Sequence, residues 1–224
     1  MEDTLTTALD KVEASIKPRL RGVLHEAAFA LSLVTGTALI CLAPGSLPRI
    51  SAIVYAGSQV LLFGTSAAYH RGPWSESGRA VMSRLDHSMI FVLIAGTYTP
   101  FLLLLLSGTL REVLFGVVWG GALAGIVARN AVRTPPRWVF VGLYLTLGWI
   151  AVIIVPQVLQ NGGVAVLVLL LTGGAFYSCG AVVYGLRRPD PSPTWFGFHE
   201  VFHAFTLAAF FCHYVAVSFI VYQH

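Results

Sequence analysis

Charged side chains are scarce in this 224-residue chain. They make up 11% of the residues, whereas hydrophobic residues make up 56%. Ordinary soluble domains carry about 25% charged residues. So few charges cannot cover a globule of this size, which excludes a soluble secreted toxin and a nucleic-acid-binding domain. The net charge of +4 does not indicate nucleic acid either, because the basic residues lie between apolar runs and form no patch.

Cysteine is scarce as well. The three cysteines, Cys41, Cys179 and Cys212, lie singly inside apolar stretches. An odd number of isolated cysteines excludes a disulfide-stapled scaffold and offers no paired thiolates for a metal. We expect buried free thiols.

Long apolar runs are what the chain has in place of charge. Seven runs approach the roughly 20 residues that cross a bilayer, and they do not alternate as barrel strands would. Lipid-facing backbone must be hydrogen-bonded internally, so the runs are expected to be helices. The first is too long for a signal peptide, so no cleaved targeting segment is expected. We predict an all-α integral membrane protein with a tail (1–21) and a seven-transmembrane helix bundle (22–224), its spans being 22–43, 48–70, 85–106, 111–128, 138–155, 162–186 and 196–222.

Lysine and arginine predict the orientation of the bundle. The tail and the loops that follow spans 2, 4 and 6 hold twelve of these residues, and the opposite ends hold only Arg49 and Arg111. Because cytoplasmic loops carry the excess of positive charge, the N-terminus is predicted to be cytoplasmic and the C-terminus outside. A plasma membrane location follows, the inner membrane in a bacterium.

Several ionisable residues lie inside the spans, where each costs roughly 2.5–3.5 kcal/mol on insertion scales. The predicted topology brings His70, at the end of span 2, to the same end of the bundle as His199 and His203, at the start of span 7. The last two are spaced i, i+4, so they share a helical face about 6 Å apart. Three imidazoles and an open position make a catalytic zinc site.

Two further polar residues belong to this predicted layer. Asp86 opens span 3, and Ser66 lies one turn before His70. We predict that Asp86 orients the attacking water or acts as a general base, and that Ser66 adds a hydrogen-bond donor. His87 is turned about 100° from Asp86 on a helix, so we do not expect both to face one site.

The remaining polar residues have other interpretations. His199 to His203 read H-E-x-x-H, the zincin signature, but no later helix follows to supply its third carboxylate ligand. His213 lies about 15 Å deeper on the same helix, and we expect a structural hydrogen bond there. His25 and Glu26 are either partners of the site or polar helix ends, and the sequence leaves both open.

Backbone signals are also present. Tyr98-Thr99-Pro100 predicts a kink repaired by threonine hydroxyls, and the glycine pairs 120–121 and 173–174 predict close helix packing.

Three motifs are distinctive: SAAYH at 66–70, LDHSMIFVLIAGTYTP at 85–100 and FHEVFH at 198–203. Together they resemble the hemolysin III family, the bacterial branch of the progestin and adipoQ receptor proteins. The resemblance covers nearly the whole chain and implies seven helices with a cytoplasmic N-terminus. It implies zinc on His70, His199 and His203, with Ser66 and Asp86 beside it, a layout that alkaline ceramidases share. We do not expect the long N-terminal domain of the adiponectin receptors, and therefore no signalling through it.

Three functions follow as hypotheses. The first is a zinc-dependent hydrolase of lipid amide or ester bonds in membrane homeostasis, with a membrane lipid as substrate. The second is a non-enzymatic membrane sensor or receptor with a structural zinc. The third is a cytolytic or channel-type protein, as the family name suggests. No nucleic-acid partner is expected, and the sequence does not indicate the oligomeric state, the native metal or the lipid.

Overall fold

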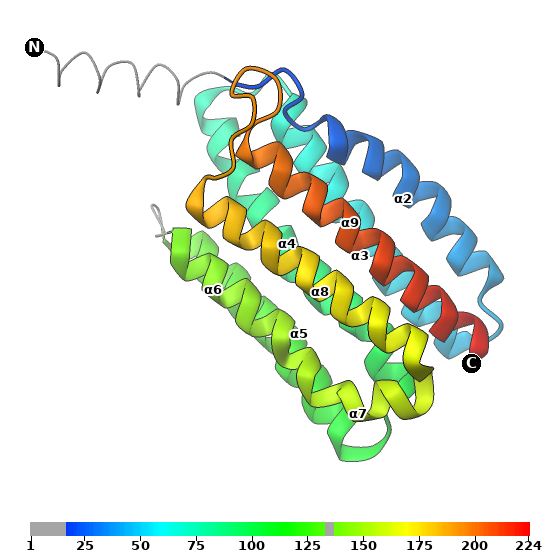
Figure 1. The fold of residues 1–224 in the computed structure, drawn as a ribbon. Helices are drawn as coiled ribbons and strands as arrows, with labels where there is room; N and C mark the ends of the chain where they lie inside the picture. Colours follow the sequence, from blue (N-terminus) through cyan, green and yellow to red (C-terminus); the bar gives the residue numbers. More distant parts are fainter. Residues whose placement is uncertain (1–16, 133–136) are drawn as a thin grey trace, which may run out of the picture.

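A computed structural model describes residues 17–132 and 137–224, and in these ranges the chain is helical with one isolated bridge, between Ser192 and Phe196. Figure 1 shows long helices running side by side along one direction. The elements are α2 (Val23–Leu42), α3 (Ser46–Arg71), α4 (Glu76–Leu105), α5 (Gly108–Ala131), α6 (Arg137–Gly148), the 3₁₀ turn η1 (Trp149–Ile154), α7 (Val155–Gln157), the π turn η2 (Val158–Gly162), α8 (Gly163–Leu186) and α9 (Phe198–Gln223).

Among the described residues, six helical stretches are long and apolar enough to cross a membrane. Five overlap predicted spans, although the third begins at Glu76 and not at residue 85, and the sixth, Arg137–Leu186, contains the predicted spans 138–155 and 162–186. Within this stretch α6 and α8 contact each other. Figure 1 shows α7 in the turn at one end that connects them. The backbone between them includes Gly163 at φ 83°, a conformation that favours glycine. The count of seven spans and the orientation stay predictions, as does the tail, of which residues 1–16 lie outside the described residues.

Helix α4 lies at the centre of the bundle. It contacts α3, α5, α6 and α9, and two thirds (67%) of its most apolar window is buried. The helix continues through Pro100, and the Thr99 hydroxyl donates to the Ala95 carbonyl at 2.9 Å. The carbonyl that Pro100 leaves without its usual partner is that of Gly96, so the Thr99 bond to Ala95 does not make the predicted repair.

The outer surface of the helices is apolar, and this corrects one prediction about cysteine. Cys41 and Cys179 are exposed and Cys212 is half-buried, although all three are free thiols. Large side chains such as Val34 and Val164 are also exposed on these faces. In a membrane protein an apolar residue can face lipid as readily as the core, so an apolar run does not by itself predict burial inside the protein.

The predicted close helix packing is found at one glycine of each pair, 120–121 and 173–174. A Cβ on Gly173 would overlap the His213 ring and one on Gly121 would lie 3.0 Å from Leu147, whereas Gly174 and Gly120 face open space. Close approach of α8 and α9 therefore depends on Gly173.

Candidate metal centre

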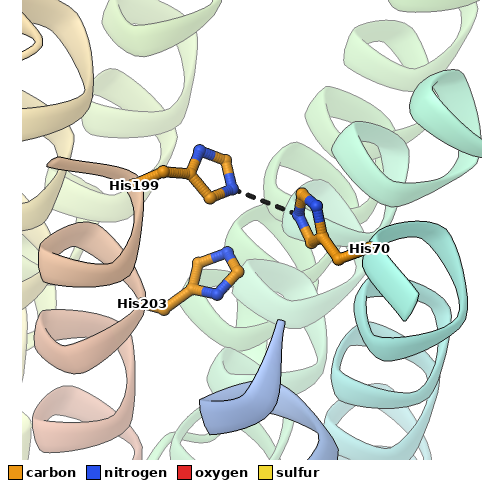
Figure 2. Close-up of side chains that lie close together, drawn as sticks. All are labelled: His70, His199 and His203. Atoms are coloured by element: carbon orange, nitrogen blue, oxygen red, sulfur yellow. Dashed lines mark hydrogen bonds between the residues drawn. The ribbon is translucent and has the colours of Figure 1, made fainter. Parts of the chain in front are cut away.

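Three histidines from two helix ends converge at one end of the bundle. His70 is the last residue but one of α3, and His199 and His203 lie on the first turns of α9. Helices α3 and α9 contact each other. The i, i+4 spacing places the two α9 rings on one face, and Figure 2 shows them turned toward His70. The structure thus brings together the three side chains that the sequence predicts as metal ligands.

The three imidazoles are close enough to share one ion. One ring nitrogen from each lies within 4.8 Å of the others. The Nε2 atoms of His199 and His70 are 3.1 Å apart, as the dashed line in Figure 2 marks. His70 and His203 are buried, and the Nδ1 atom of His203 is buried without a hydrogen-bond partner among the described residues. Zinc is commonly held by three imidazoles, so this donor set fits that ion.

His25, which the sequence allows as either a partner of the site or a polar helix end, lies against this cluster. Its ring is 3% exposed and stacks on His203, with centroids 3.6 Å apart and planes at 8°. Its Nδ1 lies 2.8 Å from the Ser66 hydroxyl. The neighbouring Glu26 instead points outward and pairs with Arg71 at 3.1 Å. The two adjacent residues therefore belong to different environments.

A cavity of about 150 Å³ opens beside the histidines. Ser66 and Asp86 line it together with His199 and His203, so the predicted polar groups face the same space. Its other walls are mainly apolar and come from α3, α4, α6, η1, α8 and α9; they include Leu62, Ile90, Leu93, Phe101, Val141, Ile154 and Phe202.

His87 faces this cavity too, which corrects the expectation that it turns away from the Asp86 site. Its Nδ1 lies 2.7 Å from the Ser83 carbonyl and must donate there, so its Nε2 accepts from the Tyr184 hydroxyl at 3.0 Å. Nδ1 is also 3.8 Å from an Asp86 oxygen. A separation of 100° on a helix still allows both side chains to border a wide cavity.

Tyr184 is a site residue that sequence reasoning missed. It lies on α8, lines the cavity and packs against His199, with centroids 5.9 Å apart. The Arg137 guanidinium covers its ring at 4.9 Å. Its hydroxyl meets His87, which lies 97 positions away in the chain. Nothing local in the sequence marks this contact.

Glu200, the glutamate of the H-E-x-x-H motif, serves the start of α9. One carboxylate oxygen accepts from the N–H of the N-cap residue Gly197 at 2.9 Å, which is the glutamate half of a capping box. The other lies 2.6 Å from Arg21 Nε. Both oxygens are engaged away from the three histidines, which argues against the base of a zincin.

The segment before α2 crosses the same end of the bundle. Lys17 donates to the backbone carbonyl of His70, and Arg19 N–H donates to the Thr194 carbonyl at 3.0 Å. Burial, and then the positive charges of Arg79 and Arg71, lower the pKa of the Lys17 amino group. The loop before α9 and the end of α3 are therefore joined by this segment.

His213 lies at the far end of the cavity from the cluster. Its Nε2 is 3.1 Å from the Leu170 carbonyl, and its ring packs on Gly173. This is the structural hydrogen bond that the sequence predicts.

The fold and these motifs have known relatives. The model of the family described as haemolysin-III related matches residues 14–214. The chain belongs to this family. It is 35% identical to a hemolysin-3 homolog of Bacillus subtilis (strain 168), over 73% of this chain and 75% of the relative. It is 32% identical to a hemolysin-3 of Bacillus cereus, over 71% of each. The human monocyte to macrophage differentiation factor is 25% identical, over 75% of this chain and 69% of the relative.

Family membership confirms the resemblance drawn from the motifs. Together with the six apolar helical stretches, it makes this haemolysin III-related chain a multi-pass membrane protein. A buried histidine cluster that could hold a metal ion lies at one end of its bundle.

Proposed function

We propose that this haemolysin III-related protein is a zinc-dependent hydrolase of lipid amide or ester bonds, acting in membrane homeostasis. His70, His199 and His203 would hold the ion. The observation that carries the proposal is the shared cavity, in which two of these histidines meet Ser66 and Asp86 beside mainly apolar walls. A lipid has a polar linkage next to an acyl chain, and the cavity has the matching two parts.

Each residue has a distinct part in the proposed reaction. A bound Zn²⁺ ion supplies a Lewis acid and lowers the pKa of a water ligand. Asp86 accepts a proton from the water that attacks the acyl carbon. A C–O bond forms, the C–N or C–O bond of the linkage breaks, and the proton passes to the leaving amine or alcohol. Ser66 donates a hydrogen bond at this position, and the apolar walls hold the acyl chain.

The proposal includes the topology of seven spans with a cytoplasmic N-terminus. The excess of arginine and lysine supports it, because twelve of these residues belong to one predicted side. Lys11 and Arg133, which enter this sum, lie outside the described residues. In this orientation the histidine layer sits at the cytoplasmic boundary of the plasma membrane, at the depth of lipid linkages.

The test combines metal content with lipid turnover on purified protein. We expect about one zinc per chain by elemental analysis, and release of fatty acid from a panel of ceramides and phospholipids. His70→Ala and His203→Ala should lose the metal. Asp86→Asn should keep the metal and lose at least ~100-fold in rate, as expected for a general base. His213→Gln, which replaces a buried histidine outside the cluster, is the matched control for the metal and should keep the metal content of wild type.

Three results would overturn the proposal. Wild type without metal would contradict the zinc site. Metal-loaded wild type without turnover on any lipid would exclude the hydrolase. Liposome leakage that scales with protein and survives His203→Ala would favour the lytic or channel-type alternative.

A sensor or receptor with a structural zinc is the second candidate. The number of chain segments tied together at the histidine layer favours it: the α2 start, the α3 end and the α9 start all meet there. In that case His203→Ala should lower the melting temperature in detergent as strongly as it lowers metal content, and no lipid in the panel should be hydrolysed.

A further inference from the structure

His25 is the fourth histidine at this end of the bundle, and its ring is held on several sides. One face lies on His203 at 3.6 Å and 8°, and Phe63 meets the ring edge-on at 5.1 Å and 71°. Its Nδ1 hydrogen-bonds with Ser66 at 2.8 Å. A ring so fixed has little rotational freedom, and neither has the His203 ring against it.

The stacked geometry argues against His25 as a fourth metal ligand. An imidazole nitrogen directs its lone pair in the plane of the ring. Two rings that are nearly parallel therefore do not aim at a common point between them. The group of ring nitrogens within 4.8 Å contains His70, His199 and His203 and does not include His25.

The start of α2 determines where His25 lies. Gly22 caps the helix at φ 83°, and a Cβ there would lie 2.6 Å from the His70 Cβ. The preceding Arg21 pairs with Glu200 of α9 at 2.6 Å. The first turn of α2 is thus seated against both helices that carry the three histidines, so its third residue is placed with little freedom.

We infer that His25 is a positioning residue that acts on both halves of the site. Its ring face sets the plane of His203 and thereby aims that ligand, while its Nδ1 holds the Ser66 hydroxyl toward the cavity. The inference rests on the proposed metal site and adds a residue from α2, an element that supplies no ligand. Outer partners of metal ligands typically change metal affinity by about 10–100-fold.

Two substitutions of His25 test its stack on His203 and its hydrogen bond with Ser66 separately. His25→Phe keeps a flat ring of similar size on His203 and removes the hydrogen bond to Ser66. His25→Asn keeps a polar group near the position of Nδ1 and removes the ring. His213→Gln is the matched control, because it also removes a buried imidazole from the bundle but touches none of the three histidines. Melting temperatures in detergent are recorded for all variants.

The readouts are zinc affinity by chelator competition, the visible absorption bands of the Co²⁺-substituted protein, and fatty acid release. For His25→Asn we expect zinc binding weaker by about 10–100-fold and shifted cobalt bands. For His25→Phe we expect zinc affinity and cobalt bands like those of wild type, with lipid turnover reduced to the level of Ser66→Ala and no further loss in the double variant. His213→Gln should leave the zinc affinity and the cobalt bands unchanged.

The outcomes distinguish the inference from the proposed function. Wild type that binds no metal overturns both. Wild type that binds zinc while His25→Asn binds it equally well overturns the inference alone. If the Asn variant does not fold, His25→Phe decides. Wild-type zinc affinity with Ser66→Ala-like turnover supports the inference, whereas lost zinc or wild-type turnover overturns it. If wild type binds zinc without hydrolysing any lipid, the cobalt bands and zinc affinity still decide the role toward His203.

Discussion

Helix α9 carries its histidines in two different settings. His199 and His203, near its start, face His70 across the contact with α3. His213, further along the same helix, faces Gly173 and the Leu170 carbonyl of α8. All three are imidazoles on one apolar helix. What separates a candidate ligand from a structural hydrogen bond is the residue across the interface.

The difference follows from how a buried polar ring can be satisfied. A buried imidazole needs a partner for its nitrogens. For His213 the Leu170 carbonyl is that partner, and Gly173 makes room for the ring. At the α9 start the neighbours are other imidazoles, which have lone pairs to offer and too few protons to hydrogen-bond every nitrogen. Such a cluster is suited to a cation.

The largest effect should come from breaking the cluster itself. In His203→Ala we expect loss of most of the bound metal, because a three-imidazole site cannot hold zinc tightly with two. In His213→Gln the metal content should equal that of wild type. Elemental analysis of the two purified variants checks this. Equal loss in both would mean that the two settings are not distinct.

Breaking the ion pair between Arg21 and Glu200 should have a smaller effect, and only on stability. Glu200→Gln keeps an acceptor for the Gly197 N–H but removes the pairing with Arg21, whose side chain is 20% exposed and can be hydrated. We expect a loss of about 1–3 kcal/mol, seen as a lower melting temperature in detergent. Metal content and turnover per folded protein should be retained. Turnover abolished with metal still bound would restore the zincin interpretation.

A loss of stability of similar size is expected where α8 packs against His213. Gly173→Ala places a methyl group against the His213 ring and should cost about 1–3 kcal/mol through forced displacement. Gly174→Ala is the matched control, since its Cβ would meet nothing within 4 Å. Denaturation in detergent compares the two. Equal stability of both variants would show that the α8–α9 contact has room to relax.

The smallest effect should come from the exposed pair. Glu26 and Arg71 are about half exposed, at 57% and 49% of their side chains, so Glu26→Gln should change stability by no more than about 0.5 kcal/mol. His25→Phe, one residue away, is predicted to reduce lipid turnover. A large effect of Glu26→Gln on metal content or turnover would place Glu26 in the site after all.

Much of the site was accessible from the sequence because it depends on helix periodicity. The i, i+4 spacing predicted that His199 and His203 share a face, and the topology predicted that His70 meets them at one end. The same periodicity misjudged His87, because it gives a direction from the axis and not the width of the cavity. Tyr184 escaped prediction, since its partner lies on another helix and no local pattern relates the two.

Apolar content and periodicity, as properties of the sequence alone, determined that this chain forms apolar helices, which residues lie near the helix ends, and which imidazoles share a face. These are local properties, since hydrogen bonding inside a helix needs only neighbouring residues. The tertiary structure decided that His25 stacks on His203 while Glu26 turns outward, and that Glu200 pairs with Arg21. It also decided which glycine of each pair is in contact. These outcomes depend on which helix lies opposite, and packing between distant segments sets that.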